Sequence, residues 1–351
     1  MGRVLDAGVT LLPGRLRLTD FIWRPGIERN SRTMLLLDLL FLAPLLASTE
    51  PPQEADTLRV LVWNIQRGAN LFEEGPKKAL QVIRDADPDI CLLQESYDVE
   101  GDRPTLGRWM AGELGWNAWQ GESPHLCVLT HLEIEERHFH HPWHGVGARL
   151  VDEQGRSLVA YSIWIDWKSY LPYLLRDEPE VSDAELLAAE SEGSDRMAQA
   201  LALLEHLEAG EHVGGGVPLL VGGDWNCPSH LDWTEDTARI FRYRRPLPLP
   251  VSLAVAEAGL VDAFRSIHPD TTRRPGNTWT PLERGTVESP TPADRIDRLY
   301  VSDPASGPRL VPFAAHVLPL ELEPMEVPAA KREFPSDHAA VIVDLRWMRG
   351  E

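Results

Sequence analysis

The chain has 351 residues, of which 43% are hydrophobic and 25% charged. This composition is typical of globular proteins and allows a sizeable core. The net charge of −20 argues against a protein that binds nucleic acid through a broadly basic surface, although it leaves room for a local basic patch. The three cysteines, Cys91, Cys127 and Cys227, have no zinc-like spacing, so we expect them to be buried and unpaired.

Residues 1–57 are expected to be a leader or a peripheral N-terminal segment. Their apolar run, residues 34–47, is short for a membrane span, and Asp38 and Pro44 interrupt it. Its length is that of a signal-peptide apolar region. Export, a short anchor and an amphipathic packing helix all remain open, and the pattern favours export over a stable membrane span.

Residues 58–347 have the pattern of one large domain in which strands interleave with a few helices. Apolar runs predict strands at 58–63, 90–96, 126–129, 158–167, 218–221, 294–301 and 339–345. Helical spacing or composition predicts helices at 77–85, 105–114, 181–207 and 252–259. This order indicates a layered α/β fold.

The most informative stretch is Val221-Gly222-Gly223-Asp224-Trp225-Asn226. We expect the strand to end at Val221 and the glycines to start a sharp exit from it. Asp224 and Asn226, two residues apart beyond a strand, then project from one edge of a sheet. A carboxylate there can take a proton from water or bind a metal. By itself, however, this pattern is also typical of a turn.

Similar polar residues follow or precede other predicted strands: Asn64, Glu95, Asp297, Asp337 and His338. Each has a simpler explanation when taken singly. Glu95 could be a solvated charge, Asn64 and the Asp337-His338 pair could cap turns, and Asp297 could form an ion pair with a neighbouring arginine, Arg295 or Arg298.

Taken together, five segments resemble the endonuclease/exonuclease/phosphatase superfamily in their order. They are Val62-Trp63-Asn64-Ile65, residues 89–95 ending in Gln94-Glu95, Gly223-Asp224-Trp225-Asn226, residues 295–300 around Asp297, and Ser336-Asp337-His338. The resemblance implies a DNase I-like fold, a four-layered α/β sandwich with two packed mixed β-sheets.

The resemblance also implies roles for these residues. Glu95 and Asp337 would bind a divalent metal, Mg²⁺ or Mn²⁺, while Asp224 would activate the attacking water. Asn226 would hold that water or a phosphate oxygen, and Asn64 would bridge the metal environment and the phosphate. His338 would contact the phosphate, with its ring oriented by Asp297. Such a cation offsets the charge of a phosphoester, and a carboxylate beside an imidazole fixes its tautomer.

Two positions depart from the family pattern. Trp164 takes the place of a histidine that the family commonly has late in a central strand. The motif Thr130-His131-Leu132 resembles that setting, but it belongs to an earlier strand. Because an indole can donate a hydrogen bond but cannot transfer a proton, the source of the leaving-group proton is open. Gln66 replaces a second carboxylate of some members, which favours one metal over two.

The sequence therefore predicts a metal-dependent phosphoesterase, and we expect it to be a monomer. Its partner would be a phosphate-ester substrate. A nuclease is the first expectation, and a lipid, inositol or small-molecule phosphoesterase is the next. The alternative is a catalytically impaired member of the same fold that binds a phosphate ligand.

Other residues have mainly structural interpretations. The histidine-rich patch, His138, His140, His141 and His144, is expected to be a solvated loop, although zinc binding is conceivable. Trp225, Trp233 and Trp279 are expected to pack in the core, with stacking on a base or sugar as the alternative. Arg196 and Gln199 are expected to give structural support.

Overall fold

The structure is a computed structural model that describes residues 56–98, 105–280, 291–319 and 334–350. Residues 1–55, including the apolar run on which the export prediction rests, lie outside the described residues. Within the described ranges, the helices are all too short or too polar to cross a membrane.

Two six-stranded sheets form the centre of the fold. The first has the order β11-β12-β1-β2-β4-β3 and the second β5-β6-β7-β8-β10-β9. Both are mixed, because the β1/β2 and β7/β8 pairs are parallel and the other pairs are antiparallel. The first sheet consists of β1 (Thr57–Asn64), β2 (Ile90–Gln94), β3 (Asn117–Trp119), β4 (Cys127–Thr130), β11 (Arg309–Leu318) and β12 (Ala340–Met348). The second consists of β5 (Glu133–His141), β6 (Gly145–Val151), β7 (Ser157–Trp164), β8 (Leu219–Asp224), β9 (Val261–Asp262) and β10 (Asp297–Ser302).

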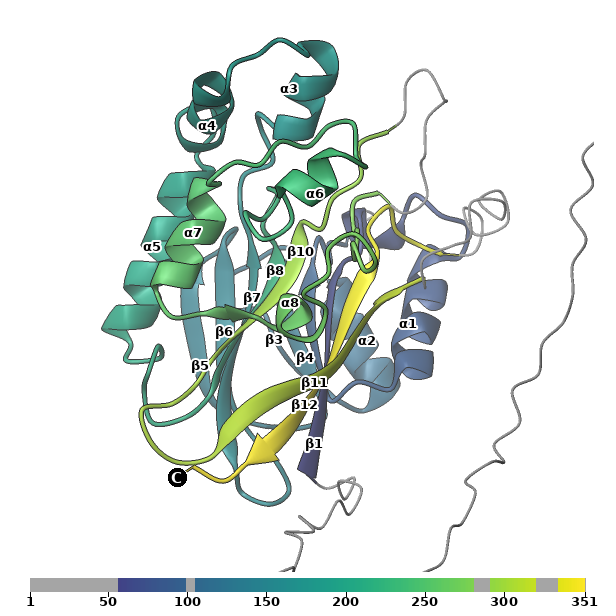
Figure 1. The fold of residues 1–351 in the computed structure, drawn as a ribbon. Coiled ribbons are helices and arrows are strands. Elements are labelled where there is room, and N and C mark those ends of the chain that lie inside the picture. The colour runs from purple at the N-terminus through teal and green to yellow at the C-terminus, as the bar shows by residue number, and fades with distance from the viewer. Residues whose placement is uncertain (1–55, 99–104, 281–290, 320–333, 351) are drawn as a thin grey trace, which may run out of the picture. The chain divides into compact units, whose positions relative to one another are not determined.

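Helices cover the outer faces of the two sheets, which gives four layers (Figure 1). On the first sheet lie α1 (Gly75–Ala86) and α2 (Leu106–Leu114), and on the second lie α5 (Arg196–Ala209) and α7 (Pro250–Glu257). The remaining helical segments are η2 (Arg67–Ala69), α3 (Leu171–Asp177), α4 (Asp183–Ser191), α6 (Glu235–Ala238) and α8 (Ala263–Ile267). The predicted four-layered sandwich is confirmed.

The central strands are apolar on both faces because each lies between two layers. In β1, Val60 and Val62 point into the core between the sheets, whereas Leu61 and Trp63 pack under α1 and α2. Successive side chains of a strand point to opposite faces. A strand buried on both faces therefore has a continuous apolar run rather than an alternating one.

The strand β8 continues through both glycines to Asp224, so the predicted exit at Gly222 is wrong. The reason is the close approach of the two sheets at this point. A Cβ atom on Gly222 would lie 2.6 Å from Leu92 Cδ1 and 2.7 Å from Val62 Cγ2. Gly222 thus lets the two sheets approach each other just before the Asp224 carboxylate.

Two other predictions of local structure are wrong. The helix expected at 181–207 is divided into α4 and α5, because the segment around Gly193 and Ser194 separates them.

The histidine patch is not a solvated loop. His138, His140 and His141 belong to β5 and are half-buried, because β5 is an edge strand with α5 nearby, and His140 and His206 of α5 have ring centroids 4.8 Å apart.

Candidate active site

The predicted site residues come together at one edge of the two sheets. Asn64 ends β1, and Glu95 directly follows β2, its parallel neighbour. Asp224 ends β8 and is paired in register with Asp297, the first residue of β10. Asp337 and His338 lie just before β12, separated from it by Ala339, and β12 pairs with β1. The ends of five strands therefore supply the site from segments far apart in the sequence.

Asn64 is fully buried and connects two carboxylates. Its Nδ2 atom donates to Glu95 Oε1 over 3.1 Å and to Asp224 Oδ2 over 3.0 Å. The backbone N–H of Arg67 donates to the other Glu95 oxygen over 3.0 Å. Asn64 does not line the pocket described below, so the role that its contacts support is to position Glu95 and Asp224.

Asp224 and Asn226 form a tight turn directly after β8. The Asn226 backbone N–H donates to Asp224 Oδ1 over 2.9 Å, and Asn226 Nδ2 donates to the Ile165 carbonyl over 2.8 Å. Asn226 has a φ of 49°, a left-handed conformation that asparagine tolerates better than most residues. The sequence pattern of Asp224 and Asn226 is also typical of a turn, and that turn is present. It holds both side chains at the pocket wall.

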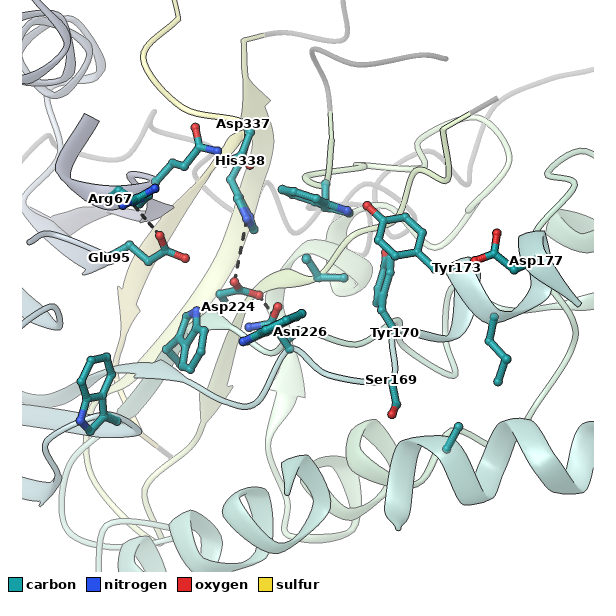
Figure 2. Close-up of a pocket in the computed structure, with 18 of the residues that line it drawn as sticks. Arg67, Glu95, Ser169, Tyr170, Tyr173, Asp177, Asp224, Asn226, Asp337 and His338 are labelled. Carbon is teal, nitrogen blue, oxygen red and sulfur yellow. Dashed lines mark hydrogen bonds and ion pairs between the residues drawn. The ribbon is translucent and has the colours of Figure 1, made fainter. Parts of the chain in front are cut away.

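His338 is oriented by Asp297. Its Nδ1 donates to Asp297 Oδ2 over 2.9 Å, and its Nε2 lies 4.0 Å from Asp224 Oδ2 (Figure 2). The Asp297 backbone N–H donates to Thr278 Oγ1 over 3.0 Å, which fixes the start of β10. Asp297 therefore pairs with His338 and not with Arg295, which pairs with Asp232 and Asp262.

Burial and neighbouring charges shift the pKa values of Asp224 and His338. Burial, together with the Asp297 carboxylate, raises the pKa of Asp224 to about 7. Burial would lower the pKa of His338, but the carboxylates of Asp297, Asp224 and Asp337 outweigh it and raise this pKa to about 10. A base is most effective when its pKa lies near the working pH. Asp224 therefore suits a base at neutral pH, and His338 suits a cationic donor.

The residues fit a divalent metal. Asp337 Oδ1 is buried and has no hydrogen-bond partner within the described ranges, and burial raises the pKa of Asp337 to about 6. Asp337 and Glu95 both line the pocket, and carboxylate oxygens are the ligands that Mg²⁺ and Mn²⁺ prefer. A cation between them would satisfy the unpaired oxygen.

A second group could also hold a cation, because ligand atoms of Asp224, Asp297 and His338 all lie within 4.8 Å of one another. We favour Glu95 and Asp337. Asp297 Oδ2 and the His338 ring are held by their mutual hydrogen bond, and Asp297 is completely buried, although its Oδ1, like Asp337 Oδ1, has no partner among the described residues.

Trp164 lies where the sequence places it. It ends β7 and is paired in register with Asp224 on the parallel strand β8. Its Nε1 atom is buried without a hydrogen-bond partner among the described residues, and the side chain lines the pocket. His131, by contrast, forms an ion pair with Asp89 over 2.9 Å and does not line this pocket.

Sequence reasoning missed an aromatic group beside Glu95. The Glu95 backbone N–H donates to His125 Nδ1 over 3.3 Å, and His125 Nε2 bonds to the Trp143 carbonyl. The His125 ring stacks on Tyr97 and meets Trp164 edge-on. Burial lowers the pKa of His125 to about 4, so this ring is neutral and supports the Glu95 backbone. A lone histidine before a predicted strand gives no signal of this contact.

These residues line one end of a pocket of about 1300 Å³. Its other end is formed by the loop after β7 and by α3 and α4, with Tyr170, Tyr173 and Asp177 among the lining residues (Figure 2). Trp279 also lines the pocket, whereas Trp225 and Trp233 are buried. The core packing predicted for the three tryptophans is thus observed for Trp225 and Trp233 but not for Trp279. Arg196 gives the expected support by donating to the carbonyls of Asp166 and Lys168.

The fold is shared by the metal-dependent phosphoesterases of one family. A model of the endonuclease/exonuclease/phosphatase family matches residues 61–338, and the chain belongs to this family. Among individual relatives, uncharacterized protein F14F9.5 of Caenorhabditis elegans is 29% identical over 326 residues, which cover 90% of this chain and all of the relative.

Solved structures agree at the level of the fold. The human Nocturnin catalytic domain with bound sulfate has a TM-score of 0.50 and 19% identity, covering 83% of this chain and 95% of that one. TDP2 of D. rerio, complexed with a single-stranded DNA product, has a TM-score of 0.52 and 12% identity, covering 83% and 99%. Members of the family generally hydrolyse phosphoester bonds with a divalent metal.

Proposed function

We propose that this protein is a Mg²⁺- or Mn²⁺-dependent phosphoesterase that hydrolyses its substrate by in-line attack of a water molecule. The observation that carries the proposal is the convergence of Glu95, Asp224, Asn226, Asp337 and His338 on one pocket wall. Solvated charges would have no reason to meet there, and a buried carboxylate beside a buried imidazole is costly unless it is paired.

Each side chain has a role that follows from its contacts. Asp224 takes the proton of the attacking water, and Asn226, fixed by two hydrogen bonds, orients that water. His338 donates from Nε2 to a phosphate oxygen, because Asp297 holds its Nδ1 proton. Glu95 and Asp337 would hold the divalent ion, which, when bound, offsets the phosphate charge and stabilises the leaving oxygen. The Trp164 indole N–H is a further donor to a phosphate oxygen.

The test is a hydrolysis screen on the full chain with plasmid DNA, single-stranded RNA, sphingomyelin, inositol phosphates and bis-p-nitrophenyl phosphate. Each is offered with Mg²⁺, Mn²⁺ or EDTA. We expect turnover that EDTA stops and that Glu95→Ala removes. The matched control is Glu208→Ala, which removes an exposed glutamate of α5 and should leave the rate unchanged. Equal turnover with EDTA would refute the proposal.

A second candidate function is the binding of a phosphate ligand without turnover. It is favoured by Trp164, which cannot transfer a proton to a leaving group. In that case metal would still bind, with Glu95→Ala abolishing binding, while the whole screen would show no hydrolysis. Whether the substrate is a nucleic acid is a separate question, which the DNA and RNA in the same screen answer directly.

A further inference from the structure

The pocket has a second arm that the phosphate chemistry does not use. It is walled by the segment that follows β7, by α3 and by α4. In Figure 2, Tyr170, Tyr173 and Asp177 lie at the opposite end of the pocket from Glu95 and Asp337. A pocket of about 1300 Å³ is far larger than one phosphate group requires, so this arm has space for the esterified alcohol of the substrate.

The surface of the arm is mainly apolar. Trp167, Tyr170, Tyr173, Leu174 and Ala189 line it. Trp167 is 62% exposed, although an indole of this size gains substantially from burial. A ligand in the arm would remove this surface from water, which is the main source of affinity for an apolar group.

Two polar groups of the arm already have partners within the protein. Ser169 Oγ donates to the Gly193 carbonyl over 2.7 Å, and the Tyr170 hydroxyl donates to Asp294 Oδ2 over 3.3 Å. Recognition of a nucleobase needs donors and acceptors that face its edge. These two groups are committed elsewhere and do not face the edge of a base in the arm.

The charge of the arm also disfavours a polyanion. Asp177 and Glu178 line its far end, whereas Arg67, a cation that lines the pocket, belongs to the Glu95 end. Arg176 neighbours the arm, but it is paired with Asp177 over 2.7 Å and lies over the Tyr173 ring. A nucleic-acid strand would bring further phosphates against carboxylates, whereas its binding requires Lys and Arg along the backbone path.

We propose that the arm binds a hydrocarbon chain and that the substrate is a phosphoester of a long-chain alcohol, a lipid phosphoester. The inference rests on the proposed function, because that function places the phosphate at Glu95, Asp337 and His338. The chain then extends from the phosphate along Trp167 and Leu174 toward Ala189. A phosphate on a short polar alcohol would leave this apolar surface in contact with water.

The test is the binding of alkylphosphonates from methyl to octyl, as monomers with Mg²⁺, measured by titration calorimetry on the full chain. Phosphonates are not hydrolysed, so the measurement does not depend on turnover. A fully buried methylene contributes about fourfold in affinity, and a partly buried one about twofold. We therefore expect Kd to fall two- to fourfold per methylene, and an oligothymidylate to bind no better than methylphosphonate.

Two matched pairs of variants locate the effect. Ala189→Phe fills the arm, whereas Ala184→Phe makes the same change at an exposed position of α4 outside the pocket. Leu174→Glu places a charge in the arm, whereas Leu201→Glu does so on the exposed face of α5. We expect both arm variants to flatten the dependence on chain length and both controls to retain it. Thermal unfolding shows that each variant is folded, and either pair alone is decisive.

A Kd that is independent of chain length, or tighter binding of the oligonucleotide, would overturn the inference. The same result with metal-dependent turnover of bis-p-nitrophenyl phosphate would leave the proposed function intact. If Kd depends on chain length but no substrate is turned over, the result would support binding of a hydrocarbon chain in the arm. It would contradict the proposal that the protein is an enzyme.

Discussion

At the scale of single residues, the site depends on one buried amide. The two N–H groups of Asn64 hold Glu95 and Asp224, which have different assigned tasks. Two carboxylates that lie close together repel each other, and a shared donor reduces that repulsion. The uncharged residue at the end of β1 thus positions both of its charged neighbours.

The assigned roles predict that Asp224→Ala and His338→Ala each abolish hydrolysis while the protein stays folded. Loss of a general base or of a positioned cationic donor lowers kcat by about 10²- to 10⁴-fold. The measurements are kcat on the substrate found in the screen and the melting temperature of each variant. A variant that retains a near-wild-type rate would show that its residue has been assigned the wrong role.

At the scale of elements, β8 shows how packing between sheets constrains sequence. The prediction is that Gly222→Ala lowers the free energy of unfolding by about 1–3 kcal/mol, because its Cβ would overlap Leu92 and Val62. The control is Gly112→Ala in α2, where no atom of the described residues lies within 4 Å of the new Cβ. That change should stabilise the protein by about 0.5–1 kcal/mol, since alanine is the better helix former. Urea denaturation measures both values, and equal effects would contradict the packing argument.

The packing of β5 near α5 is expected to make stability depend on pH. His138 and His212 have ring centroids 4.6 Å apart, and His140 and His206 4.8 Å. Burial, with neighbouring histidines, lowers the pKa of His140 and of His212 to about 4. Because these pKa values are lower in the folded state, the unfolded state binds more protons. Stability is therefore full above about pH 6.5 and falls as the pH drops toward 4.

The measurement is the free energy of unfolding between pH 8 and pH 5. His140→Gln and His212→Gln should each reduce the loss of stability on acidification. His131→Gln is the control of opposite sign, because a hydrogen bond to Asp89 raises the pKa of His131. His131 contributes stability at low pH that is lost as the pH rises, so its removal should steepen the acid loss. A slope that none of these variants changes would place the pH dependence elsewhere.

At the scale of the whole molecule, metal binding should couple to folding. Glu95 and Asp337 come from segments far apart in the chain, so the unfolded chain has no such site. A ligand that binds only the folded state stabilises it by about 2.7 kcal/mol at a concentration of 100 times its Kd. We expect Mg²⁺ or Mn²⁺ to raise the melting temperature of the wild type and to have little effect on Glu95→Ala. A metal effect that survives this substitution would point to Asp224, Asp297 and His338 instead.

The sequence by itself determined the class of fold and seven of the twelve described strands, and it named the residues that meet at the candidate site. Strands buried on both faces have continuous apolar runs that are visible without a structure, and functional residues follow or precede such runs at strand ends. The pairs Asp224 with Asn226 and Asp337 with His338 were therefore predictable. The strands β3, β5, β6, β9 and β11 were not predicted, and β5, for example, is an edge strand with a more polar sequence.

Only the tertiary structure decided which of these residues touch one another. It chose between the arginine and the His338 partner that the sequence left open for Asp297, joined Asn64 to Glu95 and Asp224, and brought His125 to the Glu95 backbone. It also created the apolar arm from α3 and α4, whose residues have no motif. The physical reason is that local sequence determines the strands and turns, whereas contacts across more than a hundred residues depend on how the two sheets and their helices pack.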